Sequence, residues 1–97
     1  MNGLGAPVFI SVIIPAYSSA STIEDCLKSL MAQEYPRDAF EVIVIDSGND
    51  GTQDVCKKYC VRYQHSPNRI SAGMARNLGA GMAKGEILAF LDADCMA

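Results

Sequence analysis

The sequence has few of the features that would tie it to nucleic acid or to a membrane. Only 8 of its 97 residues are Lys or Arg, against 11 Asp or Glu, so its net charge is −3 at pH 7. Nucleic-acid binding needs a stripe of basic side chains that displaces counterions from phosphates, and this composition argues against one. The apolar runs are far shorter than the ~18–20 residues that span a bilayer. Because the N-terminus also lacks a secretory signal, we expect a cytoplasmic protein, attached at most to the cytoplasmic face of a membrane.

The sequence gives little support for a disulfide or a zinc site. The four cysteines are Cys26, Cys56, Cys60 and Cys95. Cys56 and Cys60 are four residues apart on a predicted helix, but the sequence has a single histidine, His65, to complete a zinc site. Disulfides belong to secreted proteins, and no secretory signal is present. We therefore predict free, packed thiols, with a disulfide or a metal site as the alternative.

The sequence also lacks the glycine-rich loops that cradle phosphates. It has no G-x-x-x-x-G-K-S/T, and no G-x-G-x-x-G follows the first apolar run. Gly79, Gly81 and Gly85 lie within or at the end of a predicted helix, which indicates helix packing instead. A bound diphosphate would therefore need a metal ion or an arginine, and Arg76 is the candidate. Arg76 lies opposite an apolar stripe of the same helix, so an ordinary solvent-facing position is the alternative.

What the sequence does have is an alternation of apolar runs and helical patterns. Hydrophobic residues make up 49% of the chain, which is typical of a globular protein. We predict a leader at residues 1–8 and a single partial domain at residues 9–97. The predicted strands cover residues 9–14, 40–45, 61–64 and 87–91. The predicted helices run from Ser21 to the region before Pro36, from Thr52 to about Tyr59, and from Ser71 to Lys84.

Strands that are apolar on both faces, separated by amphipathic helices, predict an α/β fold. The order is β-α-β-α-β-α-β, with a parallel sheet covered on two sides. Residues 21–24, Ser-Thr-Ile-Glu, have the form of a capping box, and Thr52 is predicted to cap the next helix. The last helix carries Met74, Leu78 and Met82 on one stripe.

Polar and turn residues follow three of the apolar strands, at residues 15–17, 46–48 and 92–94. The carboxyl ends of parallel strands meet at one edge of the sheet, where α/β proteins bind ligands. Asp46, Asp92 and Asp94 would therefore converge on one crevice. Asp92 and Asp94 are hard oxygen ligands suited to Mg²⁺ or Mn²⁺, which take one or two protein carboxylates and add substrate phosphates. Polar turns that simply end the strands are the alternative.

Four motifs in the chain resemble those of family 2 glycosyltransferases of the GT-A fold. Residues 11–17 (Ser-Val-Ile-Ile-Pro-Ala-Tyr), Glu24 and residues 42–52 resemble the opening of the family. Residues 72–79 resemble its G-x-x-x-A-R-N-x-G helix start, and residues 90–94, Phe-Leu-Asp-Ala-Asp, resemble its DxD strand end. The resemblance covers roughly residues 10–97 and implies a Rossmann-like, partial GT-A fold.

The resemblance also implies inverting transfer of a sugar from a nucleoside diphosphate sugar. The residues that would line the nucleoside pocket are Pro15, Ala16 and Tyr17. Asp46 would accept a hydrogen bond from the base, and Arg76 would face the diphosphate. Asp92 would lie near the ribose and a divalent cation, Mn²⁺ or Mg²⁺, with Asp94 as the direct ligand. Such a cation would stabilise the charge that develops on the leaving diphosphate.

The chain departs from the family pattern after the DxD motif. In the family, the acceptor half and the carboxylate that acts as general base follow this strand, whereas here only three residues follow Asp94. No residue is therefore identified as a catalytic base. We expect the nucleotide-sugar-binding half of the enzyme, inactive alone, with the acceptor (saccharide, lipid-linked or protein) left open. We also expect self-association, because the edge of the last strand would present unpaired backbone groups.

Two other functions stay open. The chain would be a non-catalytic nucleotide-binding or metal-binding module if it works beside another chain. A Rossmann-like redox domain is disfavoured, because the glycine fingerprint for dinucleotides is absent.

Overall fold

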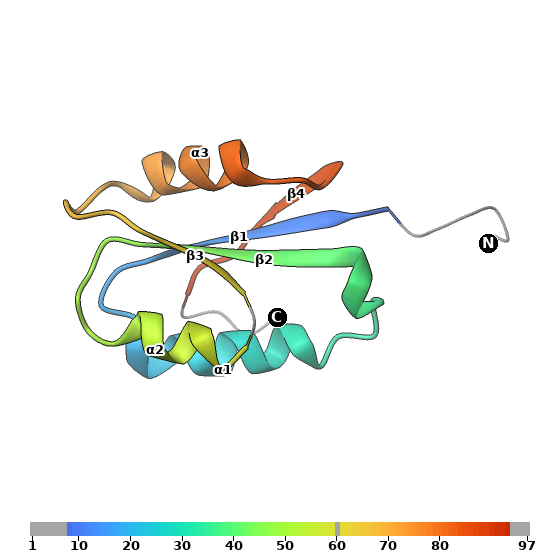
Figure 1. The fold of residues 1–97 in the computed structure, drawn as a ribbon, viewed down its shortest axis with the longest axis horizontal. Helices are drawn as coiled ribbons and strands as arrows, with labels where there is room; N and C mark the ends of the chain where they lie inside the picture. The colour runs from blue at the N-terminus through green and yellow to red at the C-terminus, as the bar shows by residue number, and fades with distance from the viewer. Residues whose placement is uncertain (1–7, 60, 94–97) are drawn as a thin grey trace, which may run out of the picture.

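A computed structural model describes residues 8–59 and 61–93. In this part of the chain a parallel four-stranded sheet has the order β3-β2-β1-β4. The elements are β1 (Ile10–Ala16), α1 (Ala20–Met31), the 3₁₀ turn η1 (Arg37–Ala39), β2 (Phe40–Asp46), α2 (Thr52–Lys57), β3 (Arg62–His65), α3 (Ala72–Met82) and β4 (Ile87–Phe90). Helix α3 covers one face of the sheet and helices α1 and α2 cover the other (Figure 1). The predicted Rossmann-like α/β fold is confirmed.

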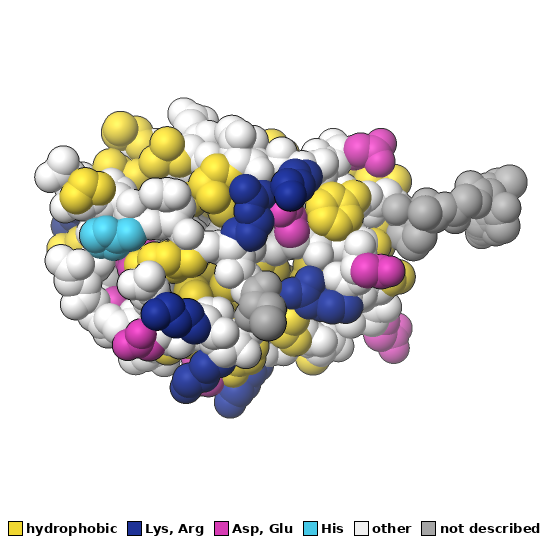
Figure 2. Space-filling view, in the orientation of Figure 1, with side chains coloured by type: hydrophobic (Ala, Val, Ile, Leu, Met, Phe, Trp, Pro, Cys, Tyr) yellow, Lys and Arg dark blue, Asp and Glu magenta, His cyan; other side chains and the backbone are white. Residues whose placement is uncertain are grey.

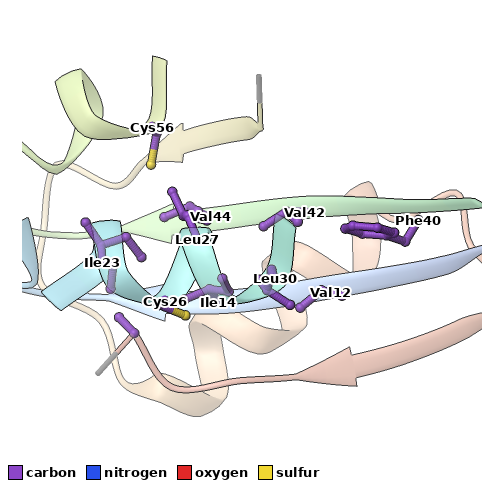
Figure 3. Close-up of a cluster of buried hydrophobic side chains, with 12 residues drawn as sticks. Val12, Ile14, Ile23, Cys26, Leu27, Leu30, Phe40, Val42, Val44 and Cys56 are labelled. Atoms are coloured by element: carbon purple, nitrogen blue, oxygen red, sulfur yellow. The ribbon is translucent and has the colours of Figure 1, made fainter. Parts of the chain in front are cut away.

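The larger part of the core lies between the sheet and helix α1. Figure 3 shows the apolar side chains of α1 packed on strands β1 and β2. The side chains that meet here include Ile23, Cys26, Leu27 and Leu30 of α1, Val12 and Ile14 of β1, and Val42 and Val44 of β2. Burial of each large aliphatic side chain contributes about 1.5–3 kcal/mol before the entropic cost of folding. This face therefore holds most of the hydrophobic stabilisation.

Helix α3 packs on the other face through its smallest residues. Its buried positions are Ala75 and Gly79, and a Cβ at Gly79 would lie 2.4 Å from Cγ2 of Ile13. The packing role predicted for Gly79 is confirmed, because only a glycine lets the helix approach β1 so closely. Gly81 has open space around it, so the same prediction for Gly81 is wrong.

The apolar stripe that the sequence indicated on this helix faces outward for most of its length. Met74 is 57% exposed and Leu78 48% exposed, while Met82 packs against the smaller core cluster. Close approach of the helix backbone is possible only over Ala and Gly, so the longer side chains lie beside the contact.

Two of the helix N-caps differ from the sequence prediction, whereas α3 starts as predicted, with Ser71 as its N-cap. Helix α1 has Ser19 as its N-cap, so Ser21 lies inside the first turn, and Glu24 accepts a 2.8 Å hydrogen bond from the Tyr59 hydroxyl. The predicted capping box is therefore wrong. The N-cap of α2 is Gly51, whose φ of 92° is left-handed, and Thr52 is already helical. The left-handed conformation favours a glycine here, so the N-cap is one residue earlier than predicted, while the helix itself begins at Thr52 as predicted.

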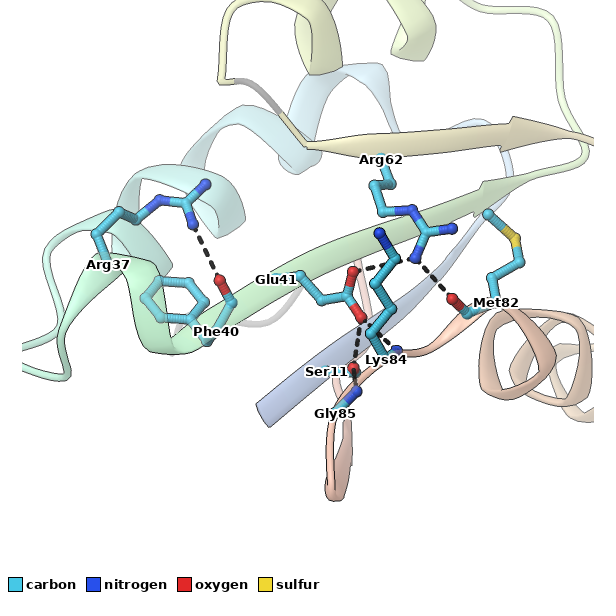
Figure 4. Close-up of polar contacts among 8 residues, drawn as sticks. All are labelled: Ser11, Arg37, Phe40, Glu41, Arg62, Met82, Lys84 and Gly85. Atoms are coloured by element: carbon cyan, nitrogen blue, oxygen red, sulfur yellow. Dashed lines mark hydrogen bonds and ion pairs between the residues drawn. The ribbon is translucent and has the colours of Figure 1, made fainter. Parts of the chain in front are cut away.

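A mostly buried carboxylate, with a side chain that is 12% exposed, joins the segments at the amino end of the sheet (Figure 4). Glu41 accepts hydrogen bonds from the Ser11 hydroxyl (2.6 Å), the Arg62 guanidinium (3.0 Å) and the Lys84 backbone N–H (2.8 Å). The Gly85 N–H donates in turn to the Ser11 hydroxyl. Burial raises the pKa of Glu41, but these hydrogen bonds outweigh it and hold the pKa below its usual value. Four segments of the chain are thus joined around one side chain.

Strand β4 lies at the edge of the sheet and covers Ile87–Phe90, slightly less than predicted. Ile87, Leu88 and Phe90 are among its exposed large side chains. The predicted self-association through this edge stays a prediction, and light scattering over a tenfold range of protein concentration tests it. Association should weaken in Leu88→Lys, because a charged side chain on an edge strand opposes pairing with another strand.

Two of the four thiols can be assessed. Cys26 and Cys56 are buried and form no disulfide, as predicted, whereas Cys60 and Cys95 lie outside the described residues, as does most of the predicted leader. None of the helices formed by residues 8–59 and 61–93 is long and apolar enough to cross a membrane. On the face shown in Figure 2, Lys and Arg side chains lie among those of Asp and Glu.

Candidate functional site

The carboxyl ends of the strands lie together, as the parallel sheet requires. Ala16 is paired with Asp46 in the register of β1 and β2, and β4 runs beside β1 until the Leu91 N–H donates to the Ile13 carbonyl. Three hollows, of about 430, 300 and 530 Å³, open around these strand ends. We call them the first, second and third hollows.

The first hollow contains the three residues predicted to line a nucleoside pocket. Its lining includes Pro15, Ala16, Tyr17, Ser47, Arg69 and Ala72 at the start of α3. The Arg69 guanidinium carbon lies 4.0 Å from the centroid of the Tyr17 ring, a distance at which a cation is attracted to an aromatic face. Sequence reasoning missed Arg69 and Ser47. Arg69 could have been identified from the sequence as a basic residue in the loop before a helix that starts at the carboxyl edge of the sheet.

A tight turn presents Tyr17 to this hollow. Ser18 has a φ of 53°, and the Ser19 hydroxyl both accepts from the Tyr17 N–H (3.2 Å) and donates to the Tyr17 carbonyl (3.1 Å). A Cβ at Gly48 would lie 3.0 Å from the Ser18 nitrogen, so the turn after β2 approaches this one closely. The Tyr17 ring is 46% exposed, which leaves one of its surfaces available to a ligand.

Asp46 lies at the carboxyl end of β2, as predicted, but it is almost completely buried there. The residue is 2% exposed and lines the second hollow, while Ser47 is the β2-end residue of the first. The Tyr63 hydroxyl donates to Asp46 Oδ2 (2.6 Å), and the Gly48 N–H donates to Oδ1 (2.9 Å). These bonds leave the Asp46 carboxylate almost without contact with solvent. Successive side chains alternate in direction at the end of a strand, so Asp46 and Ser47 face different sides of the turn.

The neighbours of Asp46 share its buried surroundings. Burial, and then the hydrogen bond to Asp46, raises the pKa of the Tyr63 hydroxyl well above its usual value. Burial also raises the pKa of the Cys56 thiol to about 11, with the Asp46 charge as the second cause. Ser66 N–H donates to the Asp46 carbonyl, and His65 Nε2 lies 2.9 Å from the Gly48 carbonyl oxygen. Strand β3 therefore holds the whole turn that follows β2.

Asp92 and Arg76 form a pair beside the third hollow. Arg76 Nη2 lies 3.6 Å from Asp92 Oδ1, and the two side chains are 40% and 63% exposed. Asp92 lines the hollow together with Pro15, Tyr17 and Ser18. Arg76 is thus partly exposed, and it is not among the residues that line the third hollow. An exposed ion pair of this kind contributes little to the stability of the fold. Both side chains are free to exchange partners when a ligand arrives.

A divalent cation would find one suitable ligand among the described residues. Within residues 8–59 and 61–93 no three His, Cys, Asp or Glu side chains are grouped to hold a metal ion. The exposed carboxylate of Asp92 nevertheless fits a Mg²⁺ or Mn²⁺ ion that takes its remaining ligands from water and phosphate. Asp94, the predicted direct ligand, lies outside the described residues.

Asp50 was not identified from the sequence, although it lies within the motif at residues 42–52. Its Oδ2 accepts a hydrogen bond from the Ala20 N–H (2.9 Å), and its Oδ1 accepts one from the Thr52 hydroxyl (2.7 Å). The Ala20 N–H, as the largest cause, lowers the pKa of Asp50. Asp50 therefore connects the loop after β2 with the start of α1, directly after the Tyr17 turn.

Known proteins with this arrangement are glycosyltransferases. The chain is 39% identical to glycosyltransferase AglE of Haloferax volcanii over 93 residues, which cover 90% of this chain and 31% of that protein. Mannosyltransferase PcManGT from Pyrobaculum calidifontis, solved in complex with GDP-Man and Mn²⁺, superposes with a TM-score of 0.85 at 32% identity, over 92% of this chain and 28% of that one. TarS residues 1–349 of S. aureus, solved with UDP-GlcNAc, gives a TM-score of 0.84 at 34% identity, over 89% of this chain and 26% of that one.

The family assignment rests on nearly the whole chain. The model of the family "Glycosyl transferase family 2" matches residues 11–97, from the first residues of β1 through the DxD motif. The chain spans 31% of the length of AglE and smaller shares of the two solved structures. This chain belongs to glycosyl transferase family 2.

Proposed function

We propose that this chain binds the nucleoside diphosphate part of a nucleotide sugar. The observation that carries the proposal is that the first and third hollows share Pro15, Tyr17 and Ala72 in their linings, and that Asp92 lines the third. A nucleoside that binds against Tyr17 in the first hollow would direct its phosphates toward Asp92 in the third hollow. Support comes from the solved complexes with GDP-Man and UDP-GlcNAc of the two proteins that superpose on this chain.

Within this proposal, the base occupies the first hollow. Tyr17 and Arg69 offer an aromatic face and a cation for stacking, and the Ser47 hydroxyl is the hydrogen-bonding group from β2. Asp46 supports the turn from behind instead of receiving the base itself. Pro15 and Ala16 form the apolar floor that a base or ribose would cover.

The diphosphate and a divalent cation belong to the third hollow. Asp92 would hold the cation together with Asp94, and Arg76, released from Asp92, would face the phosphates. The cation, Mn²⁺ or Mg²⁺, would neutralise the charge that develops on the leaving diphosphate. Mn²⁺ is present in the PcManGT complex, which supports this choice of ion.

Sugar transfer is proposed for a protein of the relatives' length. The reaction would be inverting transfer from the nucleotide sugar to a saccharide, lipid-linked or protein acceptor. We expect no transfer by these 97 residues alone, because no general base is assigned within them.

Calorimetry with UDP, GDP and CDP, each with and without Mn²⁺, tests the nucleotide-binding proposal. One nucleotide should bind, and Mn²⁺ should increase its affinity in the wild type but not in Asp92→Asn. Asp25→Asn is the matched control, because Asp25 is an exposed aspartate on α1 away from the hollows. Failure of all three nucleotides to bind a folded chain would contradict the proposal. Equal affinity with and without Mn²⁺ would remove the cation from it.

A further inference from the structure

We propose that Asp50 is a positioning residue, which holds the Tyr17 turn at a fixed distance from the turn after β2 and so shapes the nucleotide cleft. The inference builds on the proposed function. Asp50 itself lines the second hollow and neither of the hollows assigned to the nucleotide. Its effect on the nucleotide would therefore be transmitted through Tyr17.

Helix α1 does not cap its own amino end with a side chain. Its N-cap residue is Ser19, whose side chain makes no capping hydrogen bond because the hydroxyl is used within the Tyr17 turn. The first N–H groups of a helix need outside acceptors, and a carboxylate is the most favourable one there. Asp50, 30 residues further along the chain, supplies it to Ala20. The start of α1 is thus held by another loop.

Asp50 is itself held from the opposite side. The Thr52 hydroxyl donates to its second oxygen, and Thr52 is fully buried in the first turn of α2. Each carboxylate oxygen therefore bonds to a different helix start. The two loops also touch where a Cβ at Gly48 would meet the Ser18 nitrogen at 3.0 Å. A close contact alone only prevents approach, whereas the Asp50 bonds also prevent separation.

Loss of the Asp50 bonds would affect Tyr17, which lies three residues before Ala20. If the bond to Ala20 is lost, the start of α1 can move away from the β2 turn, and the Tyr17 ring moves with it relative to Arg69 and Ser47. Groups that bind the same ligand lose affinity when their spacing is no longer preorganised. Asp50 would therefore change nucleotide affinity without touching the nucleotide.

Fluorine NMR of protein labelled with 3-fluorotyrosine reports on Tyr17 directly. The Tyr17 signal is assigned by its loss in Tyr17→Phe. In Asp50→Ala this signal should shift or broaden, and affinity for UDP or GDP with Mn²⁺, whichever binds, should fall about tenfold. In Asp50→Asn both should return toward wild type, because the amide oxygen can accept from Ala20 and the amide N–H₂ can donate to the Thr52 hydroxyl. Asp54→Ala, at an exposed aspartate in the first turn of α2, is the control and should change neither.

A Tyr17 signal in folded Asp50→Ala that matches the wild type would overturn the proposal. If Asp50→Ala does not fold, Thr52→Val serves instead, since it removes one bond to Asp50 with almost no change in side-chain shape. A Tyr17 signal unchanged in Thr52→Val would then overturn the proposal equally. A wild type that binds none of UDP, GDP and CDP would contradict the proposed function alone, because the fluorine signal needs no ligand.

Discussion

The two ends of strand β2 each carry a carboxylate, mostly buried at Glu41 and fully buried at Asp46, and the two do different things. At the amino end, Glu41 accepts from Ser11, the Lys84 backbone and the Arg62 guanidinium, so its charge is paired (Figure 4). At the carboxyl end, Asp46 accepts from the Tyr63 hydroxyl and the Gly48 N–H, both of which are neutral donors. Glu41 joins four segments far from the hollows, whereas Asp46 arranges the turn that carries Ser47 into one of them.

The difference shows that burial of a charged residue says little about its function. Both carboxylates are hydrogen-bonded, as buried charges must be, and both contact β3. What separates them is their distance from the hollows at the strand ends. Asp46 can therefore affect ligand binding through Ser47, and Glu41 can affect only stability.

The largest effect is expected at the amino end. Glu41→Ala removes an acceptor from the Ser11 hydroxyl, the Lys84 N–H and the Arg62 guanidinium, and should lower the free energy of unfolding by about 2–3 kcal/mol. The Arg62 guanidinium keeps the Met82 carbonyl as an acceptor. Urea denaturation measures it, with Glu86→Ala as the control at an exposed glutamate. Nucleotide affinity of the folded variant should equal that of the wild type. A large loss of affinity would contradict the separation of the two ends.

Asp46→Ala should lower both the free energy of unfolding and the affinity for the nucleotide. The Tyr63 hydroxyl and the Gly48 N–H lose a charged acceptor, so unfolding should become easier by about 2 kcal/mol. Nucleotide affinity should fall too, because Ser47 is no longer held in place. Urea denaturation and calorimetry on the same preparation measure the two effects. Weaker binding with unchanged stability would instead return Asp46 to a direct contact with the base.

Arg69→Ala should weaken nucleotide binding about fivefold and leave the fold intact. The guanidinium lies over Tyr17 at the surface, so its removal loses a stacking contact but no buried group. Calorimetry measures the affinity, and Arg37→Ala is a matched control, since Arg37 lies over Phe40 at the other end of the sheet. Equal losses in the two variants would show a general charge effect.

The smallest expected effect is a pH dependence of the stability that Glu41 contributes at the amino end of β2. The pKa of Glu41 in the folded protein is lowered from 4.5, so its contribution to stability is fully present above that value and is lost as the pH falls through the lowered pKa. The difference in urea midpoint between wild type and Glu41→Gln should therefore shrink as the pH falls from 6 toward about 3. A difference that stays constant over this range would mean that the charge of Glu41 is not involved.

The sequence alone was sufficient for the sheet and for the position of several candidate residues at its carboxyl edge. Two β-branched runs, each followed by turn residues, predict buried parallel strands whose carboxyl ends meet, and Pro15, Ala16, Tyr17 and Asp92 lie where that argument puts them. Such patterns are local, because burial on both faces must appear as an unbroken apolar run. The motifs that resemble the glycosyltransferase family are equally local.

Only the tertiary structure decided which polar groups face the hollows at the strand ends. A strand that ends in Asp46-Ser47 offers two polar side chains on opposite sides, and the sequence does not show that Tyr63 of β3 occupies one of them. The pairing of Arg69 with Tyr17, and of Asp50 with Ala20, joins loops that are distant in the chain. Local sequence patterns do not predict these contacts, because the contacts depend on how closely the strand-end loops approach one another once the sheet has formed.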